Sequence, residues 1–247
     1  MSEVQTKPAI DVELPVNIQR QPDYTTCGPT SLHALYTYFG DSITLPDVIS
    51  QMKMHATGGT VSVHLAVHAL RRGYDATTWV SNVNYWDPTW FEKKTDLRAK
   101  LRARFAAKNW TSERYRAALA AMDEYLELGG QVVWGDLSPE RIGGVLDQGL
   151  PILAGTNGVY LYQCMRETES GPNDITGDAY GHFIVVCGYR SNDESVSVAD
   201  PLMDNPAHGT KYYRASVHRL IGAIFLGAAS DDANCLVIRP KNWQYKR

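Results

Sequence analysis

The stretch QPDYTTCGPTS, residues 21–31, places a cysteine directly before Gly-Pro at the start of a helical pattern. The apolar residues that follow recur at the spacing of one helix face, and they are Leu32, Leu35, Tyr36 and Phe39. Pro29 is acceptable in the first turn, because the N–H that proline lacks would have no partner there. The pattern therefore predicts a helix over residues 29–39, with Cys27 at its N-terminus.

A sulfur at a helix N-terminus lies near unpaired backbone N–H groups and the positive end of the helix dipole, and both stabilise a thiolate. With a histidine partner, such settings lower the pKa of a cysteine from about 8.5 to roughly 3.5–7.5. Because the thiolate is the attacking form, the sequence predicts Cys27 as a nucleophile. The competing interpretation is that Cys27 is a small buried hydrophobic residue. Gly28 is expected to let a substrate carbonyl approach the backbone.

Attack of a thiolate on a carbonyl produces an oxyanion, which needs hydrogen-bond donors already aimed at it. The backbone N–H of Cys27 is one candidate donor. The side-chain amide of Gln21 is the second, since only five residues separate it from the cysteine. The alternative is that Gln21 is an ordinary loop glutamine.

A polar turn, SNDE at residues 191–194, separates the apolar runs HFIVVCGYR and SVSVADP, which is typical of an antiparallel hairpin. His182 is the first residue of the first run, and Asp200 closes the strand in the second run, just before Pro201. A hairpin would therefore bring His182 and Asp200 to the same end of the sheet. Asp200 is then expected to orient His182, and His182 to act as base toward Cys27. Read singly, these residues are a strand-end histidine and a turn aspartate before proline.

Together, Q-x5-CGPTS, GHFIVVCGY and VADP resemble the papain-like cysteine peptidases. They are most similar to the bacterial branch that includes bacteriocin-leader (double-glycine) peptidases. That branch has the order Gln, Cys, His, Asp, with glycine before the histidine and proline after the aspartate. The matching positions are Gln21, Cys27, Gly181–His182 and Asp200–Pro201. The resemblance covers roughly residues 15–80 and 135–240.

The resemblance implies an α+β papain-like fold, with an N-terminal helical part and a C-terminal antiparallel sheet. It also implies the catalytic set Cys27, His182, Asp200 and Gln21. Thr26 departs from the branch, in which acidic residues are common before the nucleophile. The chain shows neither a membrane region nor a nucleotide-binding cassette, so the leader specificity of transporter-linked relatives is not carried over.

Residues 82–130 are different in kind, because TDLRAKLRARFAAKNW and SERYRAALAAMDEYLELGG are charged amphipathic helical patterns. They predict a helical hairpin inserted in a single domain spanning residues 1–247. The aromatic group Tyr85, Trp86, Trp90 and Phe91 is expected to pack this hairpin against its host, the alternative being a substrate cleft.

Two further segments lie in the C-terminal third. The loop 167–180 is either a mobile lid or a surface loop. The run RASVHRLIG, residues 214–222, is expected to be helical.

Composition places further limits on function. The 247 residues are 44% hydrophobic and 21% charged, with a net charge of -3, which favours neither nucleic acid nor a membrane as partner. Residues 1–20 lack the apolar segment of a secretory signal, so we expect a cytoplasmic protein. The four cysteines show neither a metal-ligand spacing nor a disulfide framework. His64 and His68 share a helix face but lack the glutamate of H-E-x-x-H, so no metal or other cofactor is expected.

These features predict a cysteine peptidase or amidase that cleaves a peptide or amide substrate through a thioester acyl-enzyme. One alternative is an aminoacyl or peptidyl transferase that uses the same triad. The other is a binding protein that keeps the fold without catalysis. The sequence predicts no oligomeric state and no cleavage motif.

Overall fold

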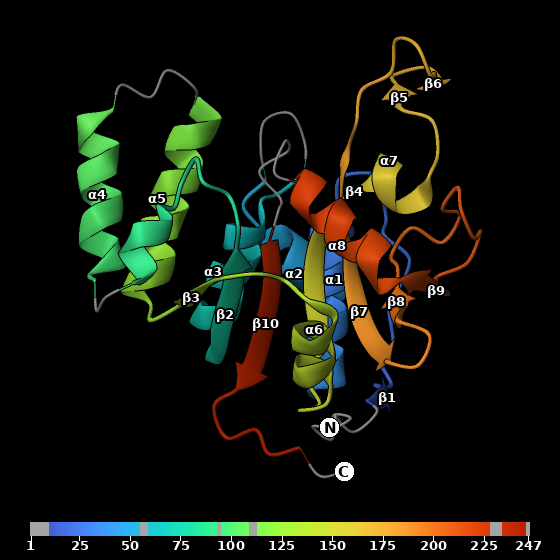
Figure 1. The fold of residues 1–247 in the computed structure, drawn as a ribbon, viewed down its shortest axis with the longest axis horizontal. Helices are drawn as coiled ribbons and strands as arrows, with labels where there is room; N and C mark the ends of the chain where they lie inside the picture. The colour runs from blue at the N-terminus through green and yellow to red at the C-terminus, as the bar shows by residue number, and fades with distance from the viewer. Residues whose placement is uncertain (1–9, 55–58, 93–94, 109–112, 228–233, 246–247) are drawn as a thin grey trace, which may run out of the picture.

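The structure is a computed structural model that describes residues 10–54, 59–92, 95–108, 113–227 and 234–245. Its main feature is a mixed sheet in the order β3-β2-β10-β4-β7-β8-β9, with β1 paired to β7 (Figure 1). The strands are β1 Asp11–Glu13, β2 Tyr74–Val80, β3 Gln131–Trp134, β4 Ile152–Asn157, β5 Glu167–Thr168, β6 Gly171–Pro172, β7 Gly181–Arg190, β8 Ser195–Ala199, β9 Tyr212–Ser216 and β10 Asn234–Pro240. The helices are α1 Cys27–Tyr38, α2 Leu45–Gln51, α3 Ser62–Arg71, η1 Pro88–Phe91, α4 Leu97–Ala107, α5 Glu113–Glu127, α6 Pro139–Leu146, α7 Gly158–Tyr162 and α8 Val217–Leu226.

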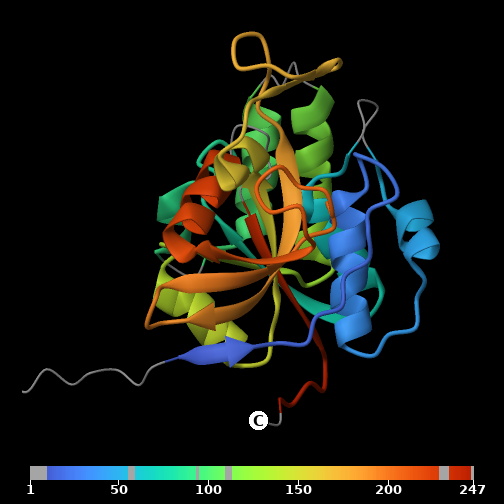
Figure 2. The ribbon, with the colours of Figure 1, turned by 90° about the vertical axis from the view of Figure 1, so that its right-hand side faces the viewer.

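Helices cover both faces of the sheet: α1 to α3 lie on one side, and α6 to α8 on the other (Figures 1 and 2). This explains why β7 is apolar along its length rather than alternating, since all residues between its two ends are buried. The described pairings are antiparallel except β2–β3, which is parallel. The α+β architecture predicted from the sequence is therefore confirmed.

The predicted hairpin is formed by β7 and β8. Val185 pairs with Ala199, and the register shifts between Val186 and Gly188. The polar residues 191–194 make the turn, as expected. Strand β9 then pairs with β8, so the predicted helix over residues 214–222 is wrong in its first three residues, which belong to β9.

Helix α1 begins at Cys27, two residues before the predicted start, and the cysteine lies at the helix N-terminus as expected. The helix is fixed to the sheet close to that end, because the Ser31 hydroxyl donates to the carbonyl of Phe183 at 3.1 Å. Thr30 donates back to the Thr26 carbonyl at 2.8 Å, which secures the first turn. The N-terminus of α1 is thereby held beside the first residues of β7.

The segment between β2 and β3 contains η1, α4 and α5 and has a small core of its own. This core buries Val80, Tyr85, Trp86, Leu101, Ala118 and Leu119. Arg98 and Arg102 on α4 both bind Asp123 on α5, which ties the two helices together. The aromatic residues therefore pack the hairpin, as the preferred interpretation predicted, with Tyr85 and Trp86 almost fully buried.

The residues predicted as a lid or surface loop form a second hairpin, β5–β6, which projects beyond α7 (Figure 1). Glu167 and Asp178 exchange two backbone hydrogen bonds, of 3.1 and 2.8 Å. At its base the Gly158 N–H donates to the Tyr180 carbonyl at 2.9 Å. The segment is thus a hydrogen-bonded structure joined to α7.

Among the residues described here, no helix is both long enough and apolar enough to span a bilayer.

Candidate active site

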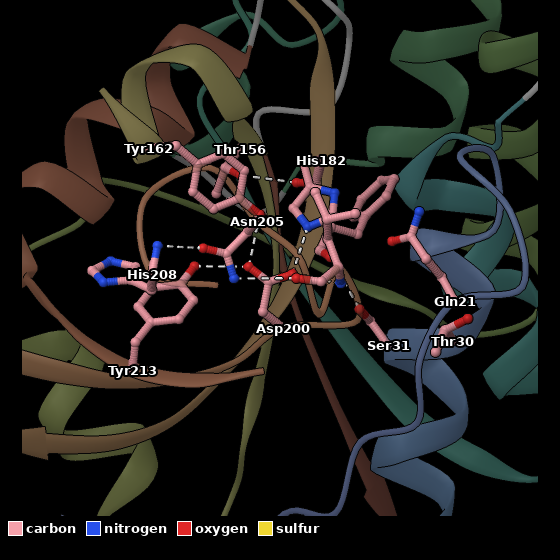
Figure 3. A network of polar contacts seen from close by, with 12 residues as sticks. Gln21, Thr30, Ser31, Thr156, Tyr162, His182, Asp200, Asn205, His208 and Tyr213 are labelled. Carbon is pink, nitrogen blue, oxygen red and sulfur yellow. Dashed lines mark hydrogen bonds and ion pairs between the residues drawn. The ribbon is translucent and has the colours of Figure 1, made fainter. Parts of the chain in front are cut away.

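His182 lies at the start of β7, opposite the N-terminus of α1. Its Nε2 donates to Asp200 Oδ1 at 2.9 Å, and its ring also hydrogen-bonds Cys27 (Figure 3 shows the His182–Asp200 contact). Because Nε2 is committed to Asp200, Nδ1 is the nitrogen left for the sulfur. The fold thus joins Cys27, His182 and Asp200 in one chain of contacts, as the hairpin prediction required.

The imidazole is placed between two groups that favour its charged form. Burial by itself lowers the pKa of His182, but the charge of Asp200 and the hydrogen bonds to Asp200 and Cys27 outweigh burial and raise this pKa to about 10. For Asp200, burial raises the pKa, yet the charge of His182 and four hydrogen bonds leave it below its ordinary value. Both groups are therefore charged around neutral pH when paired.

Gln21 lies beside the site in a buried position, 7% exposed. Its backbone N–H donates to the Pro201 carbonyl at 3.0 Å, which holds the loop next to the residue after Asp200. The side-chain Nε2 donates to the Asp23 carbonyl at 2.8 Å, while the buried Oε1 makes no hydrogen bond. Figure 3 shows that oxygen on the side of His182. Gln21 therefore lies beside His182, but its Nε2 is hydrogen-bonded to Asp23 and is not directed toward the imidazole.

Two tyrosines that the sequence did not single out also contact the site. Tyr162 on α7 and Tyr213 on β9 both donate to Asp200 Oδ2, at 2.7 and 2.8 Å (Figure 3). The Leu202 N–H donates to Oδ1 at 2.8 Å. No local motif marks these tyrosines, since each reaches the carboxylate only through the packing of α7 and the pairing of β9.

The role expected for Gly28 is different in the structure. A Cβ at this position would lie 2.9 Å from Thr60 Cγ2, 3.1 Å from Phe183 Cδ2 and 3.3 Å from Leu65 Cδ1. Gly28 is therefore required because α1 packs closely against its neighbours. Approach of a substrate is not needed to explain it.

His68, one of the two histidines on α3, is hydrogen-bonded through both ring nitrogens. His68 uses its Nδ1 toward the Tyr36 hydroxyl at 2.7 Å and its Nε2 toward Gln51 Oε1 at 3.2 Å. Within the described ranges, no group of three or more His, Cys, Asp and Glu residues is arranged to hold a metal ion.

Comparison with known proteins gives a likeness in structure. No family model matches the chain, and no curated protein matches it. A structure from Bacillus anthracis described as a C39-like peptidase aligns at a TM-score of 0.50 and 15% identity, over 96% of this chain and 98% of that one. Xylellain, a cysteine protease from Xylella fastidiosa, aligns at 0.46 and 12% identity, over 93% of this chain and 85% of that one.

A double glycine motif protease from an AMS/PCAT transporter, solved with its leader peptide, aligns at a TM-score of 0.45 and 10% identity. It covers 95% of this chain and 100% of that one. At these levels of identity the comparisons bear on the fold alone, and only the first reaches a TM-score of 0.50. The chain therefore shares its fold with the C39-like peptidase from Bacillus anthracis, in agreement with the fold that the resemblance of its motifs implied.

Proposed function

We propose that the protein is a cysteine hydrolase that cleaves a peptide or amide bond through a thioester acyl-enzyme. The observation that supports this most directly is the chain of contacts from Cys27 through His182 to Asp200. A thiol at a helix N-terminus, an imidazole in contact with it and a buried carboxylate behind that imidazole are the three parts of a papain-like triad.

In the proposed reaction, the charged His182 holds the proton given up by the Cys27 thiol, and the thiolate attacks the carbonyl carbon. The resulting oxyanion accepts hydrogen bonds from the Cys27 N–H and from the rotated amide of Gln21. His182 then gives its proton to the leaving amine, so that the C–N bond breaks and a thioester remains. Water, deprotonated by His182, releases the acid and restores the thiol. Asp200 fixes the ring orientation and stabilises the imidazolium.

The same triad would serve an aminoacyl or peptidyl transferase, in which an amine replaces water in the last step. A binding protein without activity would also have this fold. The intact contacts of His182 favour catalysis over binding alone, whereas hydrolysis and transfer differ only in how the acyl-enzyme is resolved. Trapping an acyl-enzyme from a peptide library and following its decay with and without added amines, by intact mass, separates the two reactions.

We also propose that residues 82–130 are a helical insertion within a single domain of residues 1–247. The separate small core of η1, α4 and α5 supports this arrangement. The insertion also joins the main core, to which α5 contributes Ala121 and Tyr125 and with which it shares Met122 and Leu126. A cytoplasmic location remains a prediction from the sequence.

Selective alkylation tests the proposal. We expect iodoacetamide at pH 6 to modify Cys27 faster than the other three thiols, as measured by peptide mass mapping. Burial raises the pKa of Cys187 and of Cys235 to about 12, so both should stay inert, and Cys164 serves as the more exposed internal control. His182→Ala should abolish the preference for Cys27. Equal labelling of Cys27 and Cys164 in the parent protein would contradict an activated thiolate.

A further inference from the structure

We propose that Tyr162 and Tyr213 are positioning residues, whose hydroxyls hold the Asp200 carboxylate ionised and turned so that Oδ1 faces His182. This inference rests on the proposed function, because it concerns how the triad is kept ready to react. The two tyrosines come from α7 and β9, elements on different sides of the carboxylate (Figure 3).

The four hydrogen bonds divide evenly between the two carboxylate oxygens. Oδ1 accepts from His182 and from the Leu202 N–H, and Oδ2 accepts from Tyr162 and Tyr213. An ionised carboxylate offers about four acceptor sites, so this one is saturated. Rotation of the carboxylate would break bonds at both oxygens at once. The phenols therefore fix the direction in which Oδ1 points, and through it the orientation of the imidazole.

The phenols also favour the charged state of a carboxylate that has no contact with water. Asp200 is 0% exposed, and burial without donors would favour its neutral form. Burial and then the negative charge of Asp200 raise the pKa values of Tyr162 and Tyr213 well above the ordinary value. Both phenols therefore keep their protons and can only donate to the carboxylate.

The donors act on His182 as well as on Asp200, because these two groups are in direct contact and each affects proton binding by the other. The titratable groups that face Asp200 directly or through one neighbour are His182, Cys27, Tyr162, Tyr213, Tyr180 and His208, the last stacked on Tyr213 at 4.1 Å. A hydroxyl dipole aimed into the site stabilises each more negative state of the triad. Removing one hydroxyl should therefore shift the pH dependence of Cys27 alkylation to higher pH.

The test is the pH dependence of Cys27 alkylation by iodoacetamide, which requires no substrate. Tyr162→Phe and Tyr213→Phe are each expected to raise the midpoint of this dependence, the pH at which the alkylation rate is half its maximum, by about one pH unit. Tyr125→Phe is the matched control, since that buried hydroxyl donates to the carbonyls of Ala76 and Gln131, away from the triad. Tyr125→Phe should lower the melting temperature and leave the midpoint of Cys27 alkylation unchanged.

A variant that keeps the shape of the site covers the case in which the phenylalanine variants do not fold. Replacing Tyr162 with 3-fluorotyrosine makes the phenol a stronger hydrogen-bond donor, so the midpoint of Cys27 alkylation should move to lower pH. The inference is overturned if the tyrosine variants and the parent have the same midpoint of Cys27 alkylation, while the parent still shows a selectively reactive Cys27. A parent with no selective reactivity at pH 6 overturns the proposed function as well.

Discussion

Gly28 shows how closely the residues around the nucleophile are packed. Replacing it with alanine brings a methyl group against Thr60 and Phe183, so either α1 or these neighbouring side chains must shift. We expect Gly28→Ala to lower the free energy of unfolding by about 1–3 kcal/mol in urea titrations, and to slow Cys27 alkylation because the thiol moves from His182.

Gly144 on α6 is a matched control for this substitution, because a Cβ there would meet no atom within 4 Å. Gly144→Ala should raise stability by up to about 1 kcal/mol through helix propensity and leave alkylation unchanged. If Gly28→Ala were equally well tolerated, the close packing at the start of α1 would not be a constraint.

At this scale the sequence predicts the residues that carry a local signal. Cys27 is marked by the Gly-Pro that follows it, and His182 and Asp200 by the strand pattern around one polar turn. Tyr162 and Tyr213 carry no such signal, since a tyrosine in an apolar run is most often a core residue. Their contact with Asp200 depends on how separate elements pack together, which spacing along the chain does not encode.

Among the elements, those with strong periodicity or clear turn residues are predictable. Strand β2 coincides with the β-branched and aromatic run YDATTWV, residues 74–80. Helix α6 begins after Ser138, whose side chain accepts from the Arg141 N–H as an N-cap residue does. Strands β3 and β9 carry no comparable signal, because they are edge strands of four and five residues, only partly buried. Each is defined by a neighbour far away in sequence or across a turn, so local propensity does not reveal it.

The insertion makes an element-scale prediction about independence. Leu101 on α4 is 1% exposed and belongs to the small core, so Leu101→Ala should cost about 2–5 kcal/mol of local stability. If residues 82–130 are an insertion, Cys27 alkylation should not change, whereas hydrogen exchange in α4 and α5 should accelerate. Leu128→Ala, at a site 42% exposed, is the control and should alter neither. Loss of Cys27 reactivity in Leu101→Ala would show that the two parts depend on each other.

Across the whole molecule, the site joins segments that are distant in sequence. Cys27 comes from the first helix, His182 and Asp200 from the central hairpin, and the Gln21 backbone is bonded to Pro201. Unfolding therefore separates the charges of the triad, and the stability of the protein is linked to their protonation.

The direction of that linkage follows from the two pKa shifts. Burial opposes but Asp200 and Cys27 together raise the pKa of His182 from 6.5 to about 10, so its contribution is complete below about pH 6.5 and is lost as the pH rises through 10. The pKa of Asp200 is lowered, so its contribution holds above the ordinary range and is lost as the pH falls through the folded value.

We therefore expect the free energy of unfolding to decline between pH 7 and pH 10, with this one group contributing a slope of up to about 1.4 kcal/mol per pH unit. His182→Ala should flatten the decline by that amount in urea titrations at each pH, while also lowering stability because Asp200 is left buried without its charge partner. Cys187 and Cys235 lose protons on unfolding in both proteins, so their contributions cancel in the difference between the two slopes. His218→Ala removes an exposed histidine paired with Glu194 and should keep the parent slope. Equal slopes in the parent and His182→Ala would mean that His182 is not held charged in the folded protein.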